Sequence, residues 1–70
     1  MTYVVIELQT NSDGTLGNLV YQYTDRRAAE NKYHTILAAA AISSLPVHSA
    51  VMLTNNGQLL ASDYYTNDED

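Results

Sequence analysis

The sequence contains no cysteine, so disulfides cannot reinforce the fold and thiolate metal sites are excluded. Its two histidines, His34 and His48, are too few for a structural zinc site of the usual kind. A domain of this length buries only about 60 % of the surface that its unfolded chain exposes. Small domains are commonly reinforced by disulfides, a metal or a second copy of themselves. Because the first two are excluded, the sequence favours oligomerisation.

Basic residues are also scarce, at three against eight acidic ones. Four of the acids lie near the C-terminus, at Asp63, Asp68, Glu69 and Asp70, so the remaining chain is almost neutral. No basic stripe is present that could bind duplex nucleic acid. We expect a single domain over residues 1–65 and an acidic, disordered tail over residues 66–70.

Long apolar runs are absent, and no basic leader precedes the first apolar segment, "YVVI". A membrane span needs about 18 or more consecutive apolar residues, and no segment approaches that length. The sequence therefore predicts a soluble, cytoplasmic protein with no membrane partner.

The first part of the chain has the pattern of a β-hairpin. Residues 2–9 and 17–24 are rich in strand-forming residues, and Asp13-Gly14 between them is a typical hairpin turn. A turn centred on that pair places the apolar residues of both strands on one face and leaves Glu7 and Gln22 on the other, in water. The pairs that it predicts are Leu8–Leu19, Ile6–Tyr21 and Val4–Tyr23.

A single helix is predicted from "TDRRAAENKY" onwards, because no helix breaker occurs before Pro46. Thr24 or Asp25 can cap its first free amides, and Pro46 ends it near residues 43–44. A stripe at helical spacing is expected to lie on a sheet. Its members are Ala29, Tyr33, Ile36, Leu37, Ala40 and Ser44.

A second hairpin is predicted after the helix. The segment Asn55-Asn56-Gly57 fits either a two-residue turn or a three-residue loop with glycine at positive φ. The three-residue form, which we favour, pairs Leu53 with Leu59 and Val51 with Ala61. The sequence thus predicts an α+β fold of order ββαββ, a four-stranded antiparallel sheet of two hairpins with one helix packed on one face.

A second uncharged set follows helical spacing beside the stripe that faces the sheet. It consists of His34, Ala38, Ala41 and Ile42, with Leu45 nearby. Alanine is the best helix former and costs little when exposed, so this set can simply face water. Small residues also let another backbone approach closely. Because the core of so short a chain is weak, we favour the interpretation that this set is the interface of a homodimer or larger homo-oligomer.

The start of the helix is a candidate anion site. Free amides and the positive end of the helix dipole favour anions, the guanidiniums of Arg26 and Arg27 can bind phosphate, and the ring of Tyr23 can stack on a base. Equally, the two arginines can be solvated surface charges. The sequence thus allows a second function, in which the protein sequesters a nucleotide or another phosphorylated small ligand.

No catalytic constellation is apparent. Glu30 and His34 are four residues apart on the helix, but no third metal ligand follows at a recognisable spacing. Serines lie near His48, without the pattern of a strained nucleophile turn. We therefore expect no enzymatic activity, no metal and no cofactor. An enzyme whose site forms between two chains is a third alternative.

Two segments, "DGTLGNLVYQY" and "RRAAENKYHTILAAAAISSLPVHSAVMLTNNG", carry a resemblance to a known group. They resemble a family of short uncharacterised proteins encoded by phages and prophages of Firmicutes, over residues 3–57. This resemblance implies a context and no site residues. Small phage proteins of this sort often bind host components, neutralise host defence or assist assembly. The expected function is thus a non-enzymatic, homo-oligomeric binding protein that inhibits or sequesters a host protein.

Overall fold

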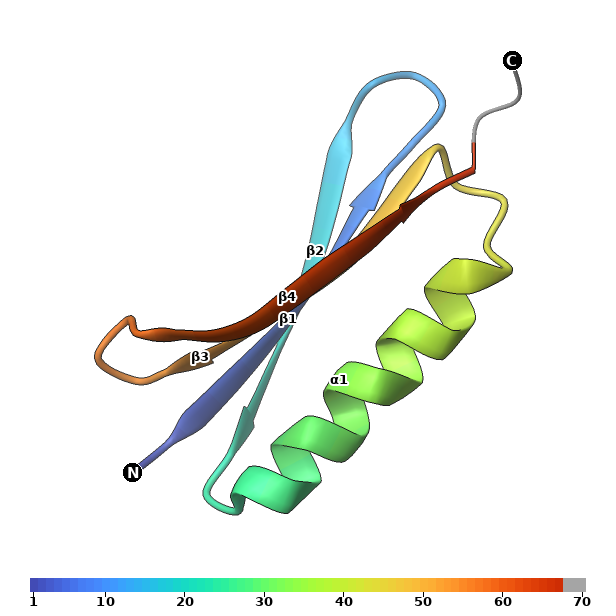
Figure 1. The fold of residues 1–70 in the computed structure, drawn as a ribbon. Helices are drawn as coiled ribbons and strands as arrows, with labels where there is room; N and C mark the ends of the chain where they lie inside the picture. Colours follow the sequence, from blue (N-terminus) through green and yellow to red (C-terminus); the bar gives the residue numbers. More distant parts are fainter. Residues whose placement is uncertain (68–70) are drawn as a thin grey trace.

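The computed structural model describes residues 1–67 and contains the expected elements in the expected order (Figure 1). Strands β1 (Tyr3–Thr10) and β2 (Leu16–Tyr23) form the first hairpin, and β3 (Val47–Thr54) and β4 (Leu59–Thr66) form the second. Helix α1 (Arg26–Ala41) connects them. All strand pairs are antiparallel, which confirms the α+β fold of order ββαββ.

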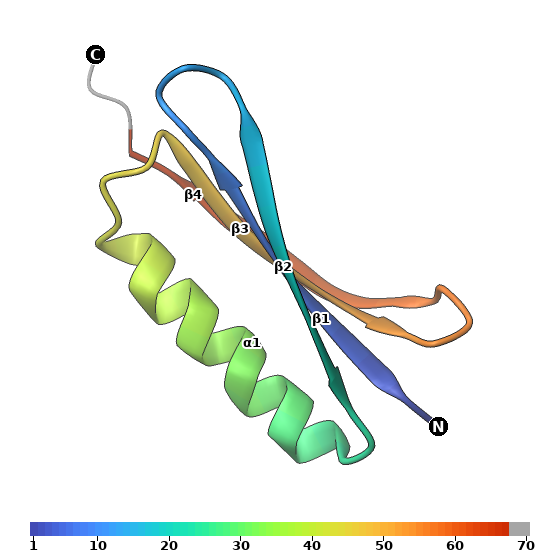
Figure 2. The same ribbon diagram turned by 180° about the vertical axis from the view of Figure 1, so that it is seen from behind.

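The four strands lie in one twisted sheet in the order β2-β1-β3-β4. The N-terminal strand is therefore central and pairs with both β2 and β3. Helix α1 covers one face of this sheet, and the opposite face carries no other element of the described chain (Figures 1 and 2). We call this second side the open face.

Helix α1 begins where the sequence predicts. The Asp25 carboxylate accepts a hydrogen bond from the Arg27 N–H at 3.1 Å and caps the first turn. The predicted stripe faces the sheet, since Ala29, Tyr33, Ile36 and Ala40 are buried and Leu37 is half-buried.

The end of α1 differs from the prediction. The helix stops at Ala41, with Ile42 as its C-cap, rather than near residues 43–44. The Ser43 hydroxyl accepts a hydrogen bond from the Leu45 N–H at 3.0 Å, which replaces the helical conformation by a local turn. Ser44, which the stripe included, therefore lies beyond the helix and is exposed.

The core lies between α1 and the two central strands. Val5 from β1 and Ala50 and Met52 from β3 are buried against the inner side of the helix. Three tyrosines pack around this cluster from the first hairpin: Tyr3, Tyr21 and Tyr23. The core contains few large aliphatic side chains, so the tyrosine rings extend it.

The predicted register of the first hairpin is wrong by one residue. Tyr21 pairs with Val5, and Leu19 pairs with Glu7. Gly14 has a φ of +89° and ends a three-residue loop, closed by the Asn11 N–H bonding to the Thr15 carbonyl at 2.8 Å. A three-residue loop shifts the pairing by one residue relative to a two-residue turn, and so changes which side chains share a face.

This shift corrects the assignment of the two faces of β1. Val5 faces the helix together with Glu7, which was expected to meet water. The alternate residues of β1, which were expected to form the core, lie on the open face instead. They are Val4, Ile6 and Leu8.

The second hairpin has the loop that we favoured. Asn55-Asn56-Gly57 forms a three-residue loop with Gly57 at a φ of +89°, and Leu53 pairs with Leu59. The predicted Val51–Ala61 pair is wrong, because a β-bulge between Met52 and Leu53 shifts the register. Ala61 lies opposite Met52, so it joins the side that faces the helix.

The ordered body extends beyond the predicted boundary at residue 65. Strand β4 continues to Thr66, and the Asn67 N–H donates to the Pro46 carbonyl at 2.9 Å. The Asn67 side chain also donates to the carbonyls of Ala40 and Leu45. The remaining part of the predicted acidic tail, residues 68–70, lies outside the described residues.

Candidate functional site

The start of α1 brings together the three residues of the predicted anion site. The carboxylate of Asp25 already accepts a hydrogen bond from a first-turn amide, and the Arg26 guanidinium donates to Glu30 at 3.1 Å. Arg27 is exposed, and the half-buried ring of Tyr23 packs against the core. None of these contacts indicates that an anion binds here, so nucleotide sequestration stays a prediction.

The predicted helix interface lies on the outer side of α1. His34, Ala38, Ala41 and Ile42 are exposed, and Leu45 is half-buried. The ring of His34 lies edge-on to Tyr33, with 5.3 Å between centroids. Four of the five residues are therefore exposed, and the role of the set in oligomerisation stays a prediction.

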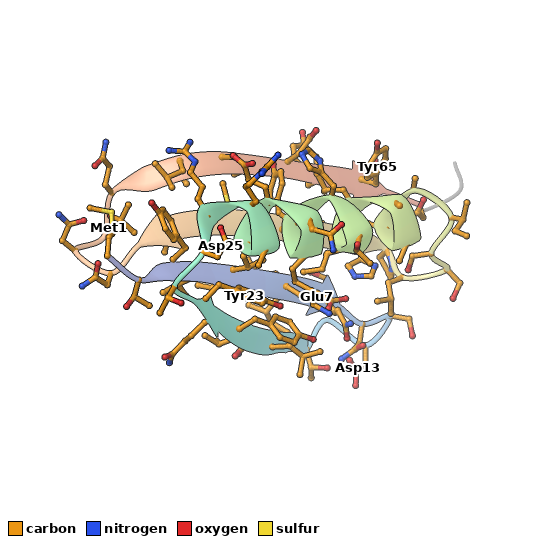
Figure 3. The ribbon with its side chains drawn as sticks, turned by 90° about the horizontal axis from the view of Figure 1, so that it is seen from below. Met1, Glu7, Asp13, Tyr23, Asp25 and Tyr65 are labelled. Carbon is orange, nitrogen blue, oxygen red and sulfur yellow. The ribbon has the colours of Figure 1, made fainter. Side chains whose placement is uncertain are left out.

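A hydrogen-bonded pair of low exposure lies on the helix side of the sheet. The Nε2 atom of His48 on β3 lies 2.6 Å from a carboxylate oxygen of Glu7 on β1. Figure 3 looks onto the helix side of the sheet and shows Glu7 on β1 beside the helix. The side chains of His48 and Glu7 are only 6 % and 13 % exposed, and Gln9 donates to the same carboxylate at 2.9 Å.

The surroundings of Glu7 favour its ionised form. Desolvation by burial raises its pKa, but hydrogen bonds from Gln9 and His48 and the positive charges of His48 and Lys32 lower the pKa by more. The net result is a pKa below the ordinary value of 4.5. The ammonium of Lys32 is held in this region because it lies 4.2 Å from the ring centroid of Tyr21.

This lowered pKa predicts a loss of stability in acid. A carboxylate with a depressed folded-state pKa stabilises the fold above its unfolded pKa of about 4.3, and this contribution disappears as the pH falls through the folded-state value. We expect the unfolding free energy of the wild type to fall more steeply below pH 4.5 than that of Glu7→Gln. Urea denaturation over a series of pH values measures both slopes, and equal slopes would contradict the prediction.

The Glu7–His48 pair has the geometry of a structural contact. Within residues 1–67 no group of three or more His, Asp or Glu side chains is placed to hold a metal ion. The Nδ1 atom of His48 is buried and has no hydrogen-bond partner among the described residues. The low exposure of both side chains leaves little of this pair accessible to a substrate.

The open face of the sheet is the most extensive surface without a partner. Strand alternation and the observed pairing place ten large apolar side chains on it, interleaved only with uncharged polar ones. The ten are Val4, Ile6, Leu8, Leu16, Val20, Val47, Val51, Leu53, Leu59 and Tyr64. Four of them are largely exposed: Leu16, Val20, Leu59 and Tyr64.

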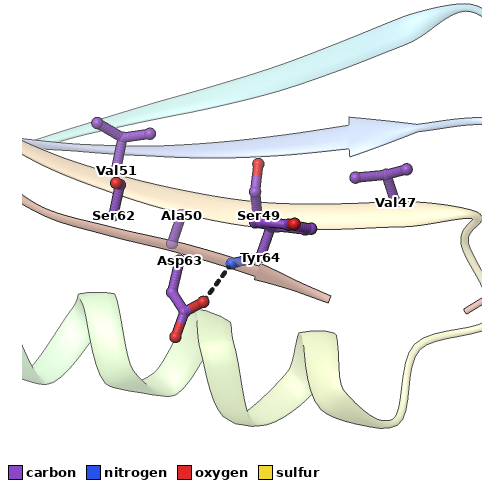
Figure 4. Close-up of a pocket in the computed structure, with 7 residues that line it drawn as sticks. All are labelled: Val47, Ser49, Ala50, Val51, Ser62, Asp63 and Tyr64. Atoms are coloured by element: carbon purple, nitrogen blue, oxygen red, sulfur yellow. Dashed lines mark hydrogen bonds between the residues drawn. The ribbon is translucent and has the colours of Figure 1, made fainter. Parts of the chain in front are cut away.

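This face is not flat. A shallow hollow of about 400 Å³ lies over β3 and β4. Figure 4 shows Val47, Ser49 and Val51 on the side away from the helix, whereas Asp63 points toward the helix. Small side chains, Ser49 and Ser62, form part of the lining, next to the exposed ring of Tyr64.

Charge is absent from the open face. Among residues 1–67, the charged side chains lie on α1, in the connecting segments, or on the helix side of the sheet, as Glu7 and Asp63 do. Monomeric proteins rarely leave so large a contiguous apolar patch in water, and such patches mark interaction sites. The open face is therefore our candidate functional site.

Comparison of the chain with family models, curated proteins and solved structures gave no match. The described chain also has no helix with the length and apolarity of a membrane span.

The sequence did contain a signal for the open face. The segments "YVVI" and "AVML" are continuous apolar runs, and such runs are typical of strands that are buried on both faces. The predicted register assigned only one face of β1 to the core and treated the other as solvated. A strand with apolar side chains on both faces has two surfaces to cover, and α1 covers only one of them (Figure 2).

Proposed function

We propose that this chain is a small, non-enzymatic binding protein that self-associates and inhibits or sequesters a host component. The observation that carries the proposal is the open face, on which ten large apolar side chains are exposed or half-buried without one charge among them. A surface of this kind binds protein rather than a small polar substrate, because it offers apolar contact area and few hydrogen-bonding groups.

The nature of the target is proposed from the resemblance of residues 3–57 to short phage and prophage proteins of Firmicutes. A phage-encoded protein of this kind acts in the host cytoplasm, and interference with host defence is one such role. The Glu7–His48 pair supports a non-catalytic function, since Nε2 of His48 is engaged with the Glu7 carboxylate and both side chains are almost inaccessible to solvent.

Capture of a host protein from a Firmicutes lysate tests this proposal. We expect the immobilised full-length chain to retain one host protein in stoichiometric amount, and to retain it in high salt because the contact surface is uncharged. Val20→Lys on the open face should abolish retention. Leu19→Lys, on the same strand but on the other face, should preserve it.

Mass spectrometry of the retained fractions identifies and quantifies the bound protein. Retention that disappears in high salt, or that Val20→Lys leaves intact, would contradict binding through the open face. Failure of any host protein to be retained would contradict the proposed function itself.

A further inference from the structure

The open face has the dimensions of a dimer interface. Its four strands each have eight residues, so it measures about 26 Å by 19 Å, or on the order of 500 Å² per copy. Two such faces together bury about 1,000 Å² before the corrugation of the side chains is counted, which is the lower limit for a biological interface. The outer side of α1 is much smaller. From His34 to the end of the helix at Ala41 it offers about 12 Å by 10 Å, too little for a dimer on its own.

The two halves of the open face differ in shape. Each half carries five of the ten large apolar side chains, and those on β1 and β2 include Ile6, Leu8 and Val20. The half formed by β3 and β4 contains the hollow, lined in part by Ser49 and Ser62. One face thus presents a shallow hollow over β3 and β4 beside the apolar side chains of β1 and β2. An isologous two-fold interface requires such self-complementarity, because each region must meet the other region of the partner.

The absence of charge also favours a second copy as the occupant. Two copies of a neutral face meet without electrostatic repulsion, even though the chain carries a net charge of −5. The acids of the described residues lie on α1, in the connecting segments or on the helix side of the sheet, away from the contact.

We propose that two copies of this chain pack open face against open face, as a sandwich of two sheets with the helices outside. A two-fold axis along the strands, between β1 and β3, lays the β1–β2 half of one copy over the β3–β4 half of the other. Sheets packed in this way lie about 10 Å apart with their strands about 30° from alignment. This inference rests on the self-association in the proposed function and names its surface.

The proposed packing of two copies can be tested at one row of side chains. Ser62, Val51, Ile6 and Val20 form a row across the four strands. The two-fold axis reverses this row in the partner, so Val20 of one copy lies over Ser62 of the other. Both positions are at edge strands and exposed, so they can be substituted without disturbing the core.

Sedimentation of the purified full-length chain alone tests the inference. We expect a dimer, and we expect Val20→Lys to raise its dissociation constant about 100-fold, because an unpaired ammonium would be buried in the interface. Leu19→Lys is the matched control, since residues 19 and 20 are 49 % and 55 % exposed on opposite faces. It should leave the dimer intact, as should Ile42→Lys on the outer side of α1. The double variant V20K/S62E should recover about tenfold of the loss.

A wild-type chain that is monomeric at high micromolar concentration would overturn the inference. So would an undisturbed dimer in Val20→Lys, or dissociation caused by Ile42→Lys alone. Absence of recovery in V20K/S62E would overturn the packing of the β1–β2 half of one copy on the β3–β4 half of the other.

A monomer that still captures a host protein through the open face leaves the proposed binding function standing. A dimer that captures none overturns the function and leaves the dimer. Circular dichroism confirms that each variant is folded.

Discussion

Ile36→Ala is expected to lower the free energy of unfolding by about 2–5 kcal/mol, the range for truncating a buried isoleucine. Ile36 is only 3 % exposed and lies in the cluster between α1 and the central strands. A domain of this size has a modest total stability, so a loss of this magnitude is a large part of it. Urea denaturation followed by circular dichroism measures the change at a fixed protein concentration, because dimerisation makes the apparent stability depend on concentration.

Ile42→Ala provides a matched control for this prediction. The substitution is the same, and the residue caps the same helix, but Ile42 is 88 % exposed. Its effect should stay within about 0.5 kcal/mol of the wild type. Equal losses in the two variants would show that the side of α1 assigned to the core is wrong.

The second large effect is expected at the buried pair of Glu7 and His48. Glu7→Leu should lower the unfolding free energy by about 1–3 kcal/mol, because it leaves the Nε2 atom of His48 buried without a partner. The other ring nitrogen already has none among the described residues. The double variant Glu7→Leu/His48→Leu should be more stable than Glu7→Leu, because an apolar pair replaces an unpaired polar group.

A double-mutant cycle at pH 7 separates this coupling from the individual losses. The two single variants and the double variant should give a coupling free energy of about 0.5–3 kcal/mol. Additive effects would mean that the two side chains contribute independently, which is incompatible with the 2.6 Å contact between them.

The sequence predicted the type and order of the helix and strands, but not which face of β1 packs against the helix. Helix α1 was found with its buried stripe because Ala29, Tyr33 and Ile36 recur at helical spacing, and because Asp25 is a strong cap. The second hairpin was found because Gly57 can adopt positive φ at the end of a three-residue loop.

The register of the first hairpin depends on whether its loop has two or three residues. Asp13-Gly14 fits both a two-residue turn and the end of a three-residue loop, and the two differ by one residue of pairing. Alternation favours the two-residue turn, because that turn places Val4, Ile6 and Leu8 opposite apolar residues of β2. The true register places Val5 beneath the helix and Ile6 on the open face.

With the wrong register, the sequence pattern indicates only the outer side of α1 as an interface and does not indicate the open face. The helix set of His34, Ala38, Ala41, Ile42 and Leu45 is visible in one continuous segment. The open face is assembled from all four strands, so its extent follows only from the strand order, which local patterns do not determine.

The central position of β1 also determines how the chain can fold as it is synthesised. Strand β1 joins β2 across a loop of three residues, but it joins β3 only after α1 has been made. Short loops close at the lower entropic cost, so the first hairpin forms early and keeps one edge of β1 unpaired. A nascent chain therefore exposes an apolar strand edge until residues 47–54 emerge, and during that interval it is most prone to pair with another unfinished chain.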